Sequence, residues 1–213
     1  MNWEQRSLQG KPIWARVTDE GDLVLENGRV PIKHDKDQSQ SYRASPGNIT
    51  LLPSDYHEQH PVTDDQIEAY VDGSRVGKKS ENGPTGVGIV LRSREGFKEI
   101  GKYTGEGTNI TAELNAIRFA LEAITDRTRP VRLYTDSEYS INALTDWIHN
   151  WRNNGWQTSG GDPVSNQDLL KEISSVMDEF NDLELHWVEG HSGHIFNERA
   201  DYLAESEAQE GQG

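Results

Sequence analysis

Four acidic residues stand at positions where a divalent cation could bind between them. Asp72 and Asp136 each end an apolar run just before a small residue. Glu113 lies at the start of an apolar helical stretch, and Asp201 lies in the last helical stretch. Each acid alone is compatible with a turn, a helix-dipole partner or a solvated helix face. If the strands ending at Asp72 and Asp136 are neighbours, their carboxylates emerge at one sheet edge, where acids without a matching Lys or Arg repel one another unless cations bind.

The hydrophobic pattern around these acids predicts a mixed α/β fold. Strands are predicted over residues 67–74, 86–93, 99–106, 131–137 and 183–190. Apolar residues recur every three or four positions in 111–124 and 166–180, which predicts two amphipathic helices. A further helical stretch begins at Glu138, and a short helix closes the chain over 197–209.

The first part of the chain has a different rhythm. Residues 12–18, 23–25 and 30–33 are short alternating or apolar runs separated by turn signals, which together predict a small meander of strands. Residues 34–44 are predicted to form a polar loop. We therefore divide the chain into a small β-rich N-terminal module (1–62), a main domain (63–208) and a disordered tail (209–213).

Composition limits the classes of function. The 213 residues carry 36 Asp plus Glu against 21 Lys plus Arg, a formal charge of −15, which is the wrong sign for a simple polyanion binder. Both parts are acidic, with 11 acidic against 7 basic residues up to residue 65 and 25 against 14 beyond it. The absence of Cys leaves carboxylates and imidazoles as metal ligands. No apolar run is long enough to span a membrane and no signal peptide is evident, so we expect a cytoplasmic monomer with no membrane partner.

Five separated segments carry a family resemblance. YVDGS, TAELNAI, YTDSEYS, DWIHNWRNNGW and WVEGHSGHIFNERADYLA resemble, in that order, the motifs of type 1 ribonuclease H of the bacterial type, over about residues 67–205. The resemblance implies a five-stranded mixed sheet, three antiparallel strands followed by two parallel ones, flanked by helices. It also implies endonucleolytic cleavage of the RNA strand of RNA–DNA hybrids, leaving 5′-phosphate and 3′-hydroxyl ends. Residues 63–208 would then be a catalytic domain.

The same resemblance assigns the catalytic residues. The family's metal-binding acids fall on Asp72, Glu113, Asp136 and Asp201. They are expected to hold two Mg²⁺ ions, or Mn²⁺, about 4 Å apart, one activating water and the other stabilising the leaving oxygen. Glu113 is also expected to contact a ribose 2′-hydroxyl. His191 matches a loop histidine that assists proton transfer or product departure.

Further residues match the family's substrate contacts. Asn109 matches a residue near the cleavage site, and Thr108 and Asn166 match positions that hold a phosphate of the DNA strand; a loop Thr and a helix-capping Asn are the alternative interpretations. The aromatic residues from Trp147 to Trp156 match a substrate-handling protrusion. The full set expected to bind the hybrid is Gly73, Ser74, Arg75, Thr108, Asn109, Trp147, Trp151, Trp156 and Asn166.

Two departures from the family weaken the expected grip on the hybrid. The protrusion is normally rich in Lys, but residues 152–166 hold only Arg152, and Glu106 replaces a usual basic residue. Fewer cations release fewer counterions on binding. Compensation could come from the loop after Asp72, which carries Arg75, Lys78 and Lys79.

The N-terminal module is the other possible source of affinity. Trp14, Tyr42 and Arg43 could stack on bases, or the module could dock a protein partner. The chain could also be an inactive hybrid-binding module, or an integrase, transposase or exonuclease of the same fold; the GHSGH loop and the Trp-bearing protrusion favour the type 1 enzyme. We further hypothesise that the excess acidity is an adaptation to elevated salt, which screens surface repulsion.

Overall fold

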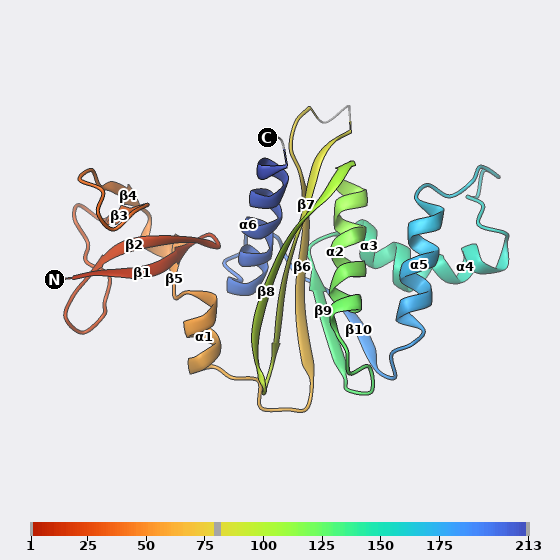
Figure 1. Cartoon of the computed structure of the whole chain (residues 1–213), viewed down its shortest axis with the longest axis horizontal. Helices are drawn as coiled ribbons and strands as arrows, with labels where there is room; N and C mark the ends of the chain where they lie inside the picture. Colours follow the sequence, from red (N-terminus) through yellow and green to blue (C-terminus); the bar gives the residue numbers. More distant parts are fainter. Residues whose placement is uncertain (1, 79–81, 212–213) are drawn as a thin grey trace.

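The computed structural model describes residues 2–78 and 82–211, which form two sheets at different places along the long axis of the molecule (Figure 1). One sheet belongs to the N-terminal module and the other forms the centre of the main domain. None of the described helices has the length and apolar character needed to cross a membrane.

The sheet of the main domain has five strands in the order β10-β9-β6-β7-β8. Its strands are β6 (Ile67–Arg75), β7 (Gly83–Ser93), β8 (Gly96–Gly107), β9 (Val131–Thr135) and β10 (Leu183–Trp187). The first three pair antiparallel, and β9 and β10 add in parallel beside β6. The predicted mixed sheet of three antiparallel and two parallel strands is therefore confirmed.

Helices cover both faces of this sheet (Figure 1). On one face lie α2 (Asn109–Ala123) and α5 (Gln167–Met177), which contact each other. The main core lies here, because the apolar stripe of α2 is fully buried at Leu114, Ile117 and Leu121. The amphipathic spacing in the sequence thus correctly predicts the face of α2 that packs against the sheet.

The opposite face is covered by α6 (Ile195–Glu210), whose buried residues beyond the first turn are the alanines Ala200, Ala204 and Ala208. A Cβ at Gly88 of β7 would overlap the backbone of α6 at Ala200, so the helix approaches the strand as closely as glycine allows. α6 extends to Glu210, which corrects the predicted tail: residues 209 and 210 are helical because they continue this packed helix. Residues 212 and 213 lie outside the described part of the chain.

A continuous helical stretch connects β9 to the segment before α5. It consists of α3 (Glu138–Asn142), a π-helical turn η2 (Ala143–Trp147) and α4 (Ile148–Asn153). This confirms the helix predicted to begin at Glu138. In Figure 1 α4 lies at the end of the molecule opposite the N-terminal module.

The N-terminal module is a sheet in the order β4-β3-β2-β1-β5, followed by one helix. Its elements are β1 (Asn2–Leu8), β2 (Lys11–Val17), β3 (Val30–Lys33), β4 (Tyr42–Ala44), the 3-10 turn η1 (Pro46–Asn48), β5 (Ile49–Thr50) and α1 (Pro53–Gln59). Ile13, Ala15 and Val30 contribute to a small separate core.

Three sequence predictions for this module were wrong. β1 was missed because its residues do not alternate; it forms because its backbone pairs along its whole length with β2. Residues 23–25 form no strand, and Leu23 makes only an isolated bridge to Val17. The predicted loop of residues 34–44 ends in β4, which pairs with β3.

Candidate active site

Sheet register brings Asp72 and Asp136 together. β6 and β9 are parallel neighbours with Tyr70 opposite Tyr134, and each aspartate follows its tyrosine by two residues. Asp72 and Asp136 therefore lie level with each other on neighbouring strands. Asp136 directly follows the end of β9, whereas β6 continues past Asp72 to Arg75.

The other two acids come from the helices on either face. Glu113 lies in α2 and Asp201 in α6. Gly73 lets α2 reach this edge, because a Cβ at that position would overlap the backbone at Ala112 and Glu113. The short distance between β6 and α2 thus depends on a glycine directly after Asp72.

The four acids share one electrostatic environment. Burial raises the pKa of the Asp72 carboxyl well above its usual range, and the charges of Asp136, Asp201 and Glu113 raise it further. Burial also raises the pKa of Glu113, although a hydrogen bond from Ser137 opposes the shift. Neighbouring carboxyl groups that resist ionisation, such as Asp72 and Glu113, are expected where a cation binds.

Residues that the sequence analysis did not single out hold these acids in place. The Ser137 hydroxyl donates a hydrogen bond to Glu113 Oε2. The Trp187 indole N–H donates to the backbone carbonyl of Asp136 over 3.1 Å. Gly190 also faces Asp136, since a Cβ there would lie 2.5 Å from Asp136 Oδ2. The small residues in the YTDS and EGHSGH segments were the available signal for Ser137 and Gly190.

The His191 loop reaches Asp201. His191 Nδ1 lies 3.6 Å from Asp201 Oδ2, while most of the imidazole is exposed. His191 adopts a left-handed φ of 52°, and the Gly193 N–H donates to Glu198 Oε1 over 3.0 Å. His191 also opposes the pKa increase that burial causes in Asp201. The loop therefore brings a titratable imidazole beside one of the four acids.

The second histidine of the loop, His194, is half-buried among aromatic rings. Its ring lies 4.9 Å from that of Tyr70 and 6.4 Å from that of Phe196. Burial lowers the pKa of His194, because the charged imidazolium is poorly solvated there. His194 therefore packs the end of the loop against Tyr70 of β6.

The donor set fits a hard divalent cation. Within residues 2–78 and 82–211, no three His, Asp or Glu side chains form a ready-made cage for an ion. Mg²⁺ does not require one, because it keeps several waters and takes one or two carboxylates together with substrate phosphates. Carboxylates that repel one another across an edge of the sheet suit that mode of binding.

The residues expected to contact the substrate differ in their local structure. Thr108 caps α2, with its hydroxyl accepting from the Thr111 N–H over 3.1 Å, so it is a helix cap and not the loop Thr of the alternative interpretation. Asn109 is exposed at the first position of the same helix. Asn166 precedes α5 with a left-handed φ of 58° and makes no side-chain capping bond, which corrects the helix-cap interpretation of this residue.

The loop after Asp72 is only partly described. Gly73, Ser74 and Arg75 belong to β6. The Arg75 guanidinium donates to the carbonyls of Val76 and Gly77. Lys79 lies outside the described residues.

The tryptophans of the predicted protrusion form a row with Tyr139. Neighbouring ring centroids are 5.8 Å apart from Tyr139 to Trp147, 5.7 Å from Trp147 to Trp151 and 6.3 Å from Trp151 to Trp156. Trp147 is 40% exposed, whereas Trp151 and Trp156 pack against the core. The row thus presents one aromatic side chain to solvent.

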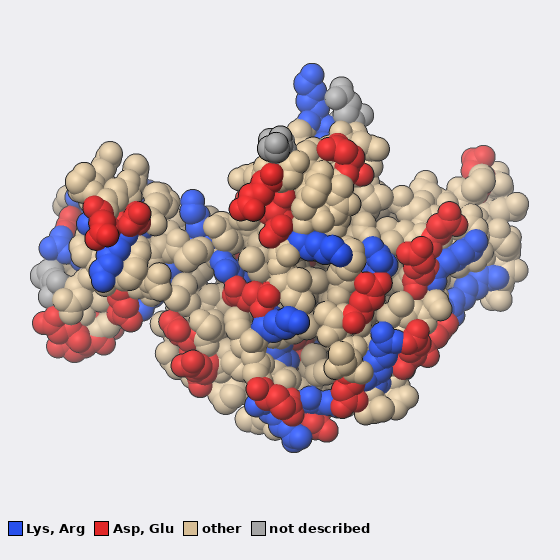
Figure 2. Space-filling model, viewed as in Figure 1, with Lys and Arg blue, Asp and Glu red and all other residues tan. Residues whose placement is uncertain are grey.

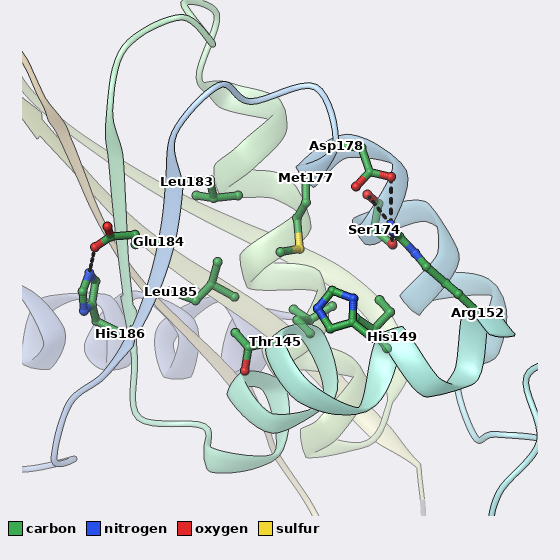
Figure 3. Close-up of a pocket in the computed structure, with 12 residues that line it drawn as sticks. Thr145, His149, Arg152, Ser174, Met177, Asp178, Leu183, Glu184, Leu185 and His186 are labelled. Atoms are coloured by element: carbon green, nitrogen blue, oxygen red, sulfur yellow. Dashed lines mark hydrogen bonds and ion pairs between the residues drawn. The ribbon is translucent and has the colours of Figure 1, made fainter.

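Arg152, the single cation of the protrusion, points back into the protein. Figure 3 shows its guanidinium directed at α5, where it donates to Ser174 and, over 2.8 Å, to Asp178. These groups border a cavity of about 420 Å³ between α4, α5 and β10 that none of the four acids lines. The protrusion is therefore even poorer in available positive charge than its sequence indicates.

The wider surface offers no compensating basic face in this view. Figure 2 shows acidic and basic side chains interspersed over the described parts of both the module and the catalytic domain. In the module, Arg43 pairs with Glu26 over 3.1 Å, and Lys36 lies over the Trp14 ring. Base stacking by Trp14, Tyr42 and Arg43 stays a prediction.

The sheet order, the helices on both faces and the acids at the edge of β6 and β9 define a class of protein, the nucleases with a ribonuclease H-like fold. The family model of RNase H matches residues 64–209. The chain therefore belongs to the ribonuclease H family, whose members are hydrolases of RNA–DNA hybrids that depend on divalent metals.

Individual relatives support this assignment. Ribonuclease H of Polynucleobacter asymbioticus is 40% identical over 154 residues, covering 72% of this chain and 97% of the relative. Ribonuclease H of Pseudoalteromonas atlantica is 44% identical over 142 residues, covering 67% and 90%. The crystal structure of LC9-RNase H1, described as a type 1 RNase H with the type 2 active-site motif, has a TM-score of 0.62 at 28% identity, covering 70% of this chain and 75% of that one.

Proposed function

We propose that this protein cleaves the RNA strand of RNA–DNA hybrids internally, by two-metal-ion hydrolysis that leaves 5′-phosphate and 3′-hydroxyl ends. The observation that carries the proposal is the position of the half-buried Asp72 beside three other acids, level with the end of β9. Such a concentration of negative charge requires cations before a polyanionic substrate can approach. Mg²⁺ suits the all-oxygen donor set, and Mn²⁺ is the expected substitute.

Asp72, Glu113, Asp136 and Asp201 would hold the ions. When bound, the pair supplies an activated water and a stabilised leaving oxygen for an in-line displacement at phosphorus. The protein's own contribution is to orient these carboxylates. Ser137 holds one oxygen of Glu113, and Trp187 and Gly190 set the backbone and carboxylate of Asp136.

His191 would move a proton at the edge of the site. Its imidazole is exposed to solvent and 3.6 Å from Asp201, so it can exchange protons with water and with groups bound beside that carboxylate. Its position on a loop with a left-handed residue also suits a role in releasing product.

Selectivity for RNA would come from Glu113, whose free oxygen can accept a hydrogen bond from a ribose 2′-hydroxyl. Asn109 and Thr108 would contact the backbone near the cleavage site, and Asn166 would contact the DNA strand. The exposed ring of Trp147 offers a surface on which the sugar or base of the DNA strand can pack.

A cleavage assay tests this function. An end-labelled RNA–DNA hybrid is incubated with Mg²⁺ or Mn²⁺, beside duplex DNA and duplex RNA of the same sequence. We expect internal cleavage of the RNA strand of the hybrid only, with phosphate at the 5′ ends of the products. Asp72→Asn and Asp136→Asn should abolish it. Activity that persists in these variants, or no cleavage with any divalent metal, would overturn the proposal.

A further inference from the structure

The N-terminal module is seated on the catalytic domain at the start of α6. The turn between β1 and β2 contains Gly10, whose carbonyl accepts a hydrogen bond from Arg199 Nη1 over 3.0 Å. Arg199 is itself held by Glu99 over 2.7 Å. A Cβ at Gly10 would overlap the carbonyl of Glu198, so this contact is possible only for a glycine. The contact lies on the helix that carries Asp201 and beside the residue that binds the His191 loop.

A cavity of about 210 Å³ lies between the module and the His191 loop. It is lined by Gln9, Asn48 and Thr50 of the module and by His191, Ser192 and Glu198 of the catalytic domain. One wall of the cavity therefore includes His191, an expected catalytic residue. The opposite wall comes from the N-terminal module, which lies outside the residues that match the ribonuclease H family.

The lining is rich in neutral hydrogen-bonding groups. Within residues 2–78 and 82–211, the exposed side-chain amides of Gln9 and Asn48 make no hydrogen bond, so both can bind a ligand. The one carboxylate of the lining, Glu198, is buried and accepts the N–H of Gly193. Amides and hydroxyls without lysine or arginine are among the groups that contact phosphate and sugar oxygens of nucleic acids.

We infer that this cavity is a subsite for the sugar–phosphate backbone of the hybrid, on the side of the active site away from the tryptophan protrusion. The inference rests on the proposed function. Figure 1 places the module and α4 at opposite ends of the molecule, so a hybrid that crosses the acids from the protrusion continues toward the module. Gln9 and Asn48 then donate to its backbone oxygens next to His191.

Such a subsite suits an acidic protein. Salt weakens the binding of nucleic acids by cations because counterion release drives that binding. Neutral donors release no counterions, so their share of the affinity is kept at high salt. The module would thus supply, without positive charge, part of the affinity for the hybrid that the lysine-poor protrusion does not provide.

The test uses the full chain and removes the two amides. Gln9→Gly suits the φ of 49° at this position, and Asn48→Ala removes the second amide. Gln40→Gly removes an exposed amide from the loop between β3 and β4 and serves as the matched control. Hybrid affinity is measured with Ca²⁺ in place of Mg²⁺, and KM and kcat with Mg²⁺, from low to molar KCl.

We expect each single variant to raise Kd and KM by about fivefold, the effect of one neutral hydrogen bond, and the double variant by more. The kcat and the slope of log Kd against log salt should stay at the wild-type values, whereas loss of a phosphate-binding cation reduces that slope by about one. A change below twofold in the double variant, or a changed slope, would overturn the subsite.

A second pair of variants separates the subsite from local effects of the amides. Gly10→Ala should unseat the module and reproduce the KM of the double variant. Gly28→Ala, at another positive φ of 76° but with no atom within 4 Å of its Cβ, should not. If Gly10→Ala binds like the wild type, the subsite is wrong. Because affinity is measured without turnover, an inactive wild type would refute the proposed function while the subsite is still tested by the Kd values.

Discussion

Gly190 stands against the carboxylate of Asp136: a Cβ at position 190 would lie 2.5 Å from Asp136 Oδ2. Gly190, in the loop that carries His191, and Asp136, directly after β9, are 54 residues apart in the sequence, yet one glycine sets how closely the two segments meet. The His191 loop therefore acts on two acids, Asp136 through Gly190 and Asp201 through the imidazole.

Gly190→Ala should lower kcat by about 10- to 100-fold with little change in KM, because a displaced carboxylate misplaces the reacting groups rather than the substrate. Steady-state cleavage kinetics measure this. Gly160→Ala is the control, since a Cβ there makes only ordinary contacts, the nearest at 3.7 Å. A Gly190→Ala variant with wild-type kcat would show that cleavage does not depend on the position that Gly190 gives the Asp136 carboxylate.

Asp72→Asn should stabilise the metal-free protein while abolishing cleavage. The half-buried Asp72 resists ionisation, and a neutral amide of the same shape removes the repulsion from Asp136, Asp201 and Glu113. We expect the free energy of unfolding at pH 7.5 in EDTA to rise by about 0.5–2 kcal/mol, the range typical of stabilising substitutions. Denaturant melts measure it, with the exposed Asp162→Asn as control. Destabilisation by Asp72→Asn would contradict the electrostatic account.

The stability of the metal-free protein should fall as pH rises above about 4, the unfolded-state pKa of carboxyl groups. The folded-state pKa values of Asp72, Glu113 and Asp201 are raised, so the folded state binds more protons than the unfolded state in this window. Their contribution is complete below the unfolded pKa and is lost as pH rises through the folded pKa values.

Denaturant melts across pH 4 to 8 measure this loss in EDTA and in Mg²⁺, which should flatten the curve. This pH range excludes the titration of Glu95 in the folded state. Hydrogen bonds, led by those from Ser93 and Arg129, lower the pKa of Glu95 to about 2. Its contribution to the free energy of unfolding is therefore lost only as pH falls below about 4. Asp72→Asn should reduce the slope in EDTA. His57 and His194 contribute in the opposite direction below pH 6.5, because burial lowers their pKa values. An EDTA slope that Asp72→Asn leaves unchanged would therefore refute the prediction.

A lysine in the protrusion should strengthen binding. Asn153 is exposed at the end of α4, and Asn153→Lys adds a cation where Arg152 is turned inward. We expect tighter hybrid binding at low salt and a slope of log Kd against log salt that steepens by about 0.9, the value for one phosphate contact. Asn153→Gln controls for side-chain length. An unchanged slope would mean that the protrusion does not face the hybrid.

Added salt should stabilise the protein. The chain carries a formal charge of −15, and screening weakens the repulsion among surface carboxylates. Thermal melts from low to molar KCl should show a rising Tm. A Tm that is flat or falls over this range would rule out adaptation to elevated salt.

Local sequence patterns were sufficient to predict the main strands and helices of the catalytic domain. The apolar runs before Asp72 and Asp136 predicted both strands, and the three- and four-residue spacing from Leu114 onward predicted α2. These elements bury most of their apolar residues in one core, so periodicity and packing carry the same information. β1 was missed because its partner β2, rather than its own pattern, makes it a strand.

Contacts between distant segments were decided only by the tertiary structure. The sequence determined which residues are acids, where the elements of the catalytic domain run and that Arg152 is the protrusion's single cation. Tertiary packing decided that Arg152 binds α5, that Gly190 meets Asp136 and that Gly10 seats the module on α6. Periodicity records which face of an element is buried, but a hydrogen bond or a steric limit between segments depends on geometry that no local pattern contains.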